Sequence, residues 1–186
     1  MRILTIVLIS IVFSPLTEFS YAQEVVEEVN MSESGDGNYY LVFMARGPVP
    51  PGHAFVMWGR EDDEKQMSTF KAFGLYPDSD NELKIVFGEV PGEIKDEWQS
   101  DKMSDITHRL IVKVNKAAYQ KSLQVKRKWE TNFQETEIST NTYELIKKDC
   151  VTFASDIARS IGLLIPDRNL STYLPEDFIR ALIDIN

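Results

Sequence analysis

The pattern of apolar and polar residues divides the chain into short strands followed by helices. Apolar runs at 39–45, 53–59 and 109–114 have the length of buried strands, and a return segment at 67–77 and a run within 82–92 add two more. In the run at 53–59, alternation puts His53, Phe55 and Met57 on one face of the strand. The polar stretch at 93–108 is expected to be irregular or to hold a short helix.

Helical patterns dominate the second half. Asn115 is placed to cap a helix through 116–130, and a polar connection follows it. From Cys150 onward apolar residues recur at helical spacing until Gly162, where the helix is expected to end. Pro175 starts the last helix. Strands first and helices afterwards predict an α+β fold, in which an antiparallel sheet of about five strands packs on the cysteine-bearing helix, with two further helices.

The N-terminal segment has the pattern of a secretory signal. Arg2 precedes an apolar run at 3–13, and Ser20, Tyr21 and Ala22 end the segment with small residues at the positions a signal peptidase reads. The alternative is an uncleaved anchor, but the run is short for a membrane span. We therefore expect a signal peptide at 1–22, a flexible acidic leader at 23–38 and one domain at 39–186, in a secreted or periplasmic protein with no membrane span after cleavage.

The net charge of −9 disfavours nucleic acid and anionic surfaces as partners. One cysteine and two scattered histidines do not make a ligand cluster, so no metal and no cofactor is predicted. The oligomeric state is left open by the sequence.

The single cysteine has two interpretations. In an exported protein a lone thiol is either reactive or simply a small buried hydrophobe. The first turn of a helix favours a thiolate at Cys150, but the same position also lies on the apolar stripe of the helix. Of the two histidines, His108 is expected at the surface, whereas His53 begins an apolar strand and is the candidate base.

Three ordered segments resemble the circularly permuted NlpC-like, papain-fold cysteine hydrolases. They are Gly52-His53-Ala54-Phe55, Phe73-Gly74-Leu75-Tyr76-Pro77, and Asp149-Cys150 with Phe153. The resemblance implies a permuted papain-like fold with Cys150 as nucleophile and His53 as base. Asp149 stands where the family commonly has asparagine. The polar residue that orients the histidine is not readable, because the register of Ser68 and Thr69 on the return segment is open.

The resemblance implies an exported cysteine peptidase or amidase that cleaves an amide bond through a Cys-His thiolate mechanism. Its substrate would be a peptide or a peptidoglycan-like polymer. Two alternatives remain: a weakly active or inactive binding module on the same fold, and a thiol acyltransferase or lipid-handling enzyme that needs an apolar groove.

Overall fold

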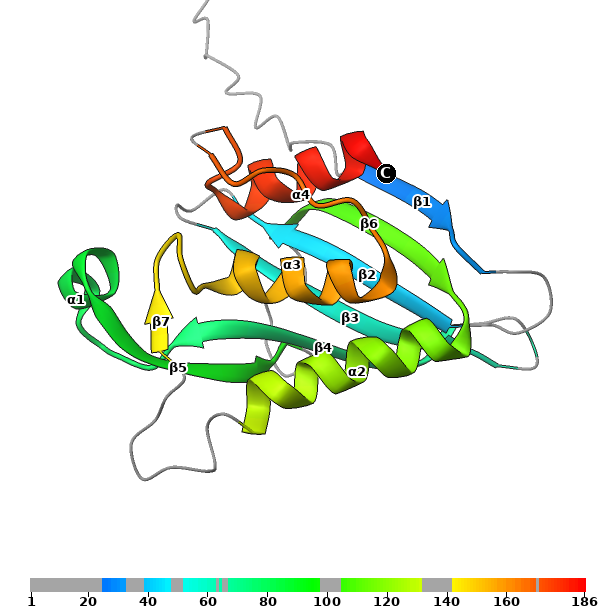
Figure 1. The fold of residues 1–186 in the computed structure, drawn as a ribbon, viewed down its shortest axis with the longest axis horizontal. Helices are drawn as coiled ribbons and strands as arrows, with labels where there is room; N and C mark the ends of the chain where they lie inside the picture. The colour runs from blue at the N-terminus through cyan, green and yellow to red at the C-terminus, as the bar shows by residue number, and fades with distance from the viewer. Residues whose placement is uncertain are drawn as a thin grey trace, which may run out of the picture.

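The computed structural model describes residues 25–32, 39–47, 52–62, 64, 67–97, 105–131, 142–169 and 171–186 (Figure 1). These residues form a seven-stranded sheet and four helices, so the protein has the mixed α+β architecture predicted from the sequence. The predicted signal peptide at 1–22 lies outside the described residues. Within the described part, no helix combines the length and the hydropathy needed to cross a membrane.

The strands run in the order β1-β6-β2-β3-β4-β5-β7 across the sheet. Neighbouring strands are antiparallel except β1, which pairs with β6 in parallel. The strands are β1 (Val25–Asn30), β2 (Tyr39–Arg46), β3 (His53–Glu61), β4 (Met67–Pro77), β5 (Glu89–Asp96), β6 (Ile106–Val114) and β7 (Thr142–Glu144).

Helices α2, α3 and α4 cover one face of the sheet (Figure 1). The helices are α1 (Glu82–Phe87), α2 (Lys116–Thr131), α3 (Cys150–Ile161) and α4 (Pro175–Ile185). Alternation along β3 directs Ala54, Val56 and Trp58 into the main core beneath the helices. Phe55 and Met57 point to the opposite face, into a second, smaller cluster. Both faces of β3 are therefore buried, as its continuous apolar run predicts.

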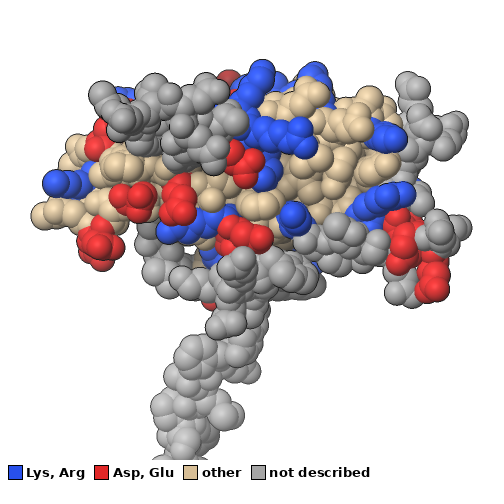
Figure 2. Space-filling model, turned by 90° about the horizontal axis from the view of Figure 1, so that it is seen from below, with Lys and Arg blue, Asp and Glu red and all other residues tan. Residues whose placement is uncertain are grey.

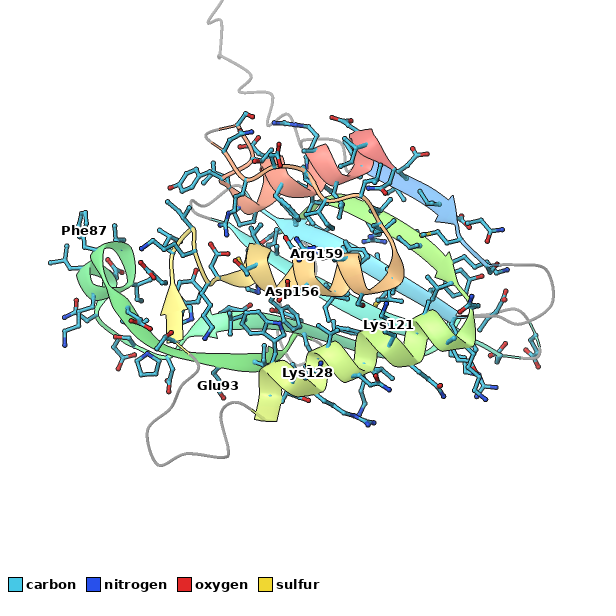
Figure 3. All side chains as sticks on the ribbon, in the orientation of Figure 1. Phe87, Glu93, Lys121, Lys128, Asp156 and Arg159 are labelled. Carbon is cyan, nitrogen blue, oxygen red and sulfur yellow. The ribbon has the colours of Figure 1, made fainter. Side chains whose placement is uncertain are left out.

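The predicted helix boundaries around the cysteine are confirmed. Asp149 caps α3 and Gly162 ends it with a left-handed φ of 95°, a conformation that glycine adopts without strain. Asn115 accepts a hydrogen bond from the Ala118 N–H (2.9 Å) at the start of α2. The polar side of α3 faces away from the sheet, where Asp156 and Arg159 pair at 2.9 Å (Figure 3).

The structure differs from the sequence prediction in several segments, and β7 is one strand that the sequence did not predict. Residues 82–87 form a helix rather than a strand, because the side chain of Asn81 caps the N–H of Lys84 (3.1 Å). Residues 89–96, expected to end a strand and enter an irregular stretch, form β5 along the edge of β4. Within the expected flexible leader, Val25–Asn30 pair with β6, and the rest of 23–38 lies outside the described residues apart from 31–32.

Candidate active site

Cys150 is the first residue of α3, and the cap next to it is fully formed. The Asp149 carboxylate accepts the Thr152 N–H (3.1 Å), and the Thr152 hydroxyl faces the Asp149 N–H in return (3.4 Å). Such a capping box stabilises a helix by about 1 kcal/mol. It holds the backbone of Cys150 in one position against β3, and the thiol is only 4% exposed.

Arg168 neutralises the carboxylate beside the cysteine. Both guanidinium ends of Arg168 bind Asp149, with Nη1 to Oδ1 at 2.8 Å and Nη2 to Oδ2. Asp149 also accepts the Ile146 N–H at 2.8 Å and is 2% exposed. Bidentate arginine–carboxylate pairs are among the strongest ion pairs in proteins. The carboxylate at the position of the family's asparagine is therefore balanced by a cation from the segment after α3.

His53 lies at the start of β3 in a buried polar cluster. Its Nε2 is 2.8 Å from Glu97 Oε1, and Glu97 is 1% exposed. Arg46 donates to Glu97 Oε2 (3.2 Å) and to the Tyr76 hydroxyl (2.6 Å). The His53 ring is tilted against the ring of Tyr76 (centroids 4.1 Å apart) and stacks on Phe55 (6.0 Å). Glu97 therefore contacts His53 through one carboxylate oxygen and Arg46 through the other.

Gly74 leaves the space in which His53 meets Glu97. A Cβ atom on Gly74 would lie 2.2 Å from His53 Nε2 and 2.7 Å from Glu97 Oε1. No side chain fits there without moving both groups. The glycine in the Phe73–Pro77 segment is therefore required by sterics, not by its backbone conformation.

The ionised Glu97 carboxylate and the burial of the imidazole together define the tautomer of His53. The histidine and arginine partners hold the pKa of Glu97 below its usual value against the opposing effect of burial. Burial lowers the pKa of His53, although Glu97 opposes this shift. A neutral imidazole beside an ionised carboxylate donates its Nε2 proton to Glu97, because an ionised carboxylate only accepts. Nδ1 then carries a lone pair and is able to accept a proton.

Cys150 and His53 approach each other at the end of β3. The N–H of Ala54, the residue after His53, interacts with the Cys150 sulfur and lowers its pKa, as does the N–H of Val151. The imidazole, however, lies on the sheet face of Phe55, opposite α3. Among the described residues, no hydrogen bond joins the Cys150 thiol to the His53 ring.

The thiol is neutral in this state. Burial, and then the charge of Asp149, raise the pKa of Cys150 to about 12, which outweighs the two backbone N–H groups and Arg168. The sequence left two interpretations of Cys150 open, a thiolate favoured by the helix N-terminus and a small buried hydrophobe. In this state desolvation in the core is the larger effect on the pKa of the thiol.

A small pocket opens beside the sulfur. The residues that line it are Gly52, Tyr143, Leu145, Asp149, Cys150, Tyr173, Leu174 and Pro175. Its volume of about 10 Å³ leaves room for roughly one water molecule. Burial raises the pKa of Tyr143, and the neighbouring thiol raises it further, so its hydroxyl stays protonated beside the sulfur.

Sequence reasoning selected Cys150 and His53, which lie at the two ends of this site, but missed Glu97 and Arg168. Glu97 follows a polar strand and has no motif around it. The prediction that His108 is at the surface is wrong: it is 6% exposed in β6, with Nδ1 3.6 Å from Glu176. Packing of α4 on that end of β6 covers it. No group of histidine, cysteine and acidic side chains in the described part could hold a metal ion.

No protein-family model, no curated protein and no solved structure matches this chain.

Proposed function

We propose that this protein is an exported cysteine hydrolase of the permuted NlpC-like, papain-fold type that cleaves an amide bond, with Cys150 as nucleophile and His53 as base. One observation carries the proposal: the thiol at the first turn of α3 interacts with the peptide N–H that follows His53. Because the imidazole lies on the opposite face of the sheet, the proposal requires a rearrangement at the end of β3 that brings Nδ1 of His53 within hydrogen-bond reach of the sulfur.

Glu97 is the orienting group in this proposal. Its contact with Nε2 leaves Nδ1 as the nitrogen that accepts the thiol proton. The contact also fixes the ring plane and stabilises the imidazolium once it forms. The second Glu97 oxygen is bound by Arg46, so the carboxylate is held on both sides.

The reaction has two halves. In the first, His53 Nδ1 takes the Cys150 proton as the sulfur attacks the carbonyl carbon, and the imidazolium then protonates the leaving amine as the carbon–nitrogen bond breaks. In the second, His53 takes a proton from water as the oxygen attacks the thioester carbon, the carbon–sulfur bond then breaks to release the carboxylic acid, and the imidazolium returns the proton to sulfur. In this proposal, backbone N–H groups in the first turn of α3 would bind the oxyanion.

The raised thiol pKa requires that substrate binding changes the site. A pocket with room for one water does not hold an acyl group, so the wall formed by Tyr173, Leu174 and Pro175 has to move outward when substrate enters. Entry of the polar amide and approach of the imidazole to the sulfur would both lower the pKa of the thiol. The thiolate therefore forms in the complex rather than in the resting protein.

A second candidate is an inactive binding module on the same fold. The neutral, 4% exposed thiol favours it, because a core cysteine has these properties without any catalytic role. No feature of the pocket beside Cys150 favours an acyltransferase, which needs room for an acyl chain at the thiol.

Amide cleavage by the mature chain tests the proposal. The protein is incubated with purified peptidoglycan and, separately, with a mixed peptide library, and new amines are quantified. Cys150→Ser, which preserves the size of the side chain, and His53→Gln should each abolish cleavage, whereas Asp156→Asn on the exposed side of α3 should leave it unchanged. Cleavage that survives Cys150→Ser contradicts the proposal. Absence of cleavage together with a thiol that labels only after unfolding favours the binding module.

A further inference from the structure

Two asparagines begin the pattern Asn-x-Ser, in which x is not proline. They are Asn30, in Asn30-Met31-Ser32, and Asn169, in Asn169-Leu170-Ser171. In an exported protein this pattern is the acceptor for an N-linked glycan. The same letters also arise by chance, so the local geometry decides whether each asparagine can act as an acceptor.

Both patterns adopt the same turn. Asn30 Oδ1 accepts the Ser32 N–H (3.0 Å) and the Ser32 hydroxyl (2.7 Å). Asn169 Oδ1 accepts the Ser171 N–H (2.8 Å) and the Ser171 hydroxyl (2.6 Å). This is an Asx-turn, in which the asparagine side chain bonds to the backbone two residues on. One turn follows β1 and the other lies between α3 and α4, so the shared geometry comes from the pattern and not from a common element.

The turn prepares the asparagine amide for reaction at its nitrogen. An amide nitrogen is a weak nucleophile, because its lone pair is delocalised into the carbonyl. Two hydrogen bonds to Oδ1 stabilise negative charge on that oxygen, so they help the nitrogen to lose a proton as it forms a new bond. Within the described part of the chain, Nδ2 of Asn30 and Nδ2 of Asn169 donate no hydrogen bond, so both nitrogens are available.

Both asparagine side chains are exposed, and both backbones are fixed. Asn30 ends β1, the edge strand of the sheet (Figure 1), and the next N–H, that of Met31, donates to the Lys113 carbonyl (2.8 Å). The Asn169 N–H donates to the Thr172 hydroxyl (2.9 Å), and the Thr172 N–H donates to the Asn169 carbonyl (3.1 Å). An enzyme can therefore reach each amide without unfolding a core element.

An acidic residue also stands two positions before each asparagine. Glu28 precedes Asn30 and Asp167 precedes Asn169, and both acidic side chains are exposed. Residues two apart on a strand share a face, so Glu28 lies beside Asn30. A transferase that holds its acceptor through a basic side chain would recognise this carboxylate. Acidic and basic side chains are interspersed on the side of the molecule seen from below (Figure 2), so recognition falls to such local patterns.

We propose that Asn30 and Asn169 are N-glycosylated in the compartment to which the chain is exported. The donor is an oligosaccharide joined to a lipid through a diphosphate. A bond forms between Nδ2 and the anomeric carbon of the sugar as the bond between that carbon and the diphosphate oxygen breaks. The diphosphate leaves with the bonding electrons, and the Nδ2 proton passes to a base of the transferase. This proposal rests on the proposed export and not on amide cleavage.

Mass spectrometry of peptides from the exported protein, purified from its source cell, tests the proposal. Both asparagines should carry a glycan. Ser32→Ala should remove the glycan from Asn30 alone, and Ser171→Ala should remove it from Asn169 alone, although each asparagine is still present. Ser32→Thr, which keeps the hydroxyl, should retain the glycan. Glu28→Gln should lower the fraction of Asn30 that is modified, and an unchanged fraction would overturn the role of the carboxylate.

The control variant is Asn81→Gln. Asn81 is exposed, but Leu83 stands where the pattern needs serine, so this variant should keep both glycans. An exported chain that begins near Gln23 and has no glycan would overturn the proposal, as would a glycan that survives both serine-to-alanine substitutions. Retention of Met1 would overturn it together with export. Amide cleavage is measured on the purified chain in a separate assay, so failure here leaves that result unchanged.

Discussion

Gly74→Ala is the substitution that most directly tests the buried His53–Glu97 contact. The new Cβ would lie 2.2 Å from His53 Nε2, whereas carbon atoms pack at roughly 3.5–4.0 Å. The ring has to move by about 1 Å, which breaks the 2.8 Å contact with Glu97. Gly74 does not have a left-handed φ, so its backbone accepts alanine and the effect comes from the side chain alone.

The expected cost follows from the contact that is lost. A hydrogen bond to a charged group contributes about 1.5–3 kcal/mol, and displacing a 1% exposed carboxylate from one partner adds to it. Replacing glycine with alanine also reduces the conformational entropy of the unfolded chain, which offsets the loss by about 0.4–1 kcal/mol. We expect Gly74→Ala to lower the free energy of unfolding by about 2–3 kcal/mol and to abolish amide cleavage, because the imidazole loses its orientation.

Urea unfolding and the cleavage rate measure the two effects. Gly88→Ala, whose Cβ would meet one backbone oxygen at 3.2 Å at the end of α1, is the matched control, with a change within about 0.5 kcal/mol expected. Glu97→Ala removes the same contact, so combining it with Gly74→Ala should add much less than its own cost. A fully additive pair, or a Gly74→Ala protein as stable and active as wild type, would refute the reasoning.

Four further outcomes are expected. Arg168→Met should lower the free energy of unfolding by about 3 kcal/mol, because Asp149 is left buried and unpaired, and Asp149→Asn in the same chain should restore most of it, as urea unfolding would show. The free energy of unfolding should be highest above about pH 6.5 and should fall as the pH drops further, because the pKa of His53 is lower in the folded protein and the unfolded chain binds this proton first. Unfolding curves recorded at several pH values should show a weaker pH dependence for His53→Gln. Iodoacetamide should label native Cys150 slowly at neutral pH and faster up to strongly alkaline pH, and Asp149→Asn should increase the rate measured by mass spectrometry, since burial and that carboxylate raise the thiol pKa. N-terminal sequencing of the exported protein should begin near Gln23, and retention of Met1 would contradict the signal-peptide prediction.

Local signals were sufficient for the elements that carry the two candidate residues. Asp149, the apolar spacing after Cys150 and Gly162 define α3 from its first residue to its last, because caps and helical periodicity act within a few residues of each other. The alternation from His53 onward likewise predicted β3 and the face on which the histidine lies. In the same way, the short capping signal at Asn81 decided α1, although the apolar run after it had suggested a strand.

Tertiary structure alone decided what surrounds those two residues. Glu97 reaches His53 from a segment 44 positions away, across β4, and it does so only because Gly74 leaves the space between them. Arg168 reaches Asp149 from the segment after α3, 19 positions away. The thiol pKa depends on burial, which belongs to the packed core and not to the helix terminus that the sequence reveals. Periodicity and capping arise from neighbours along the chain, whereas charge pairing and desolvation arise from neighbours in space, and a single sequence specifies the second kind only through the completed fold.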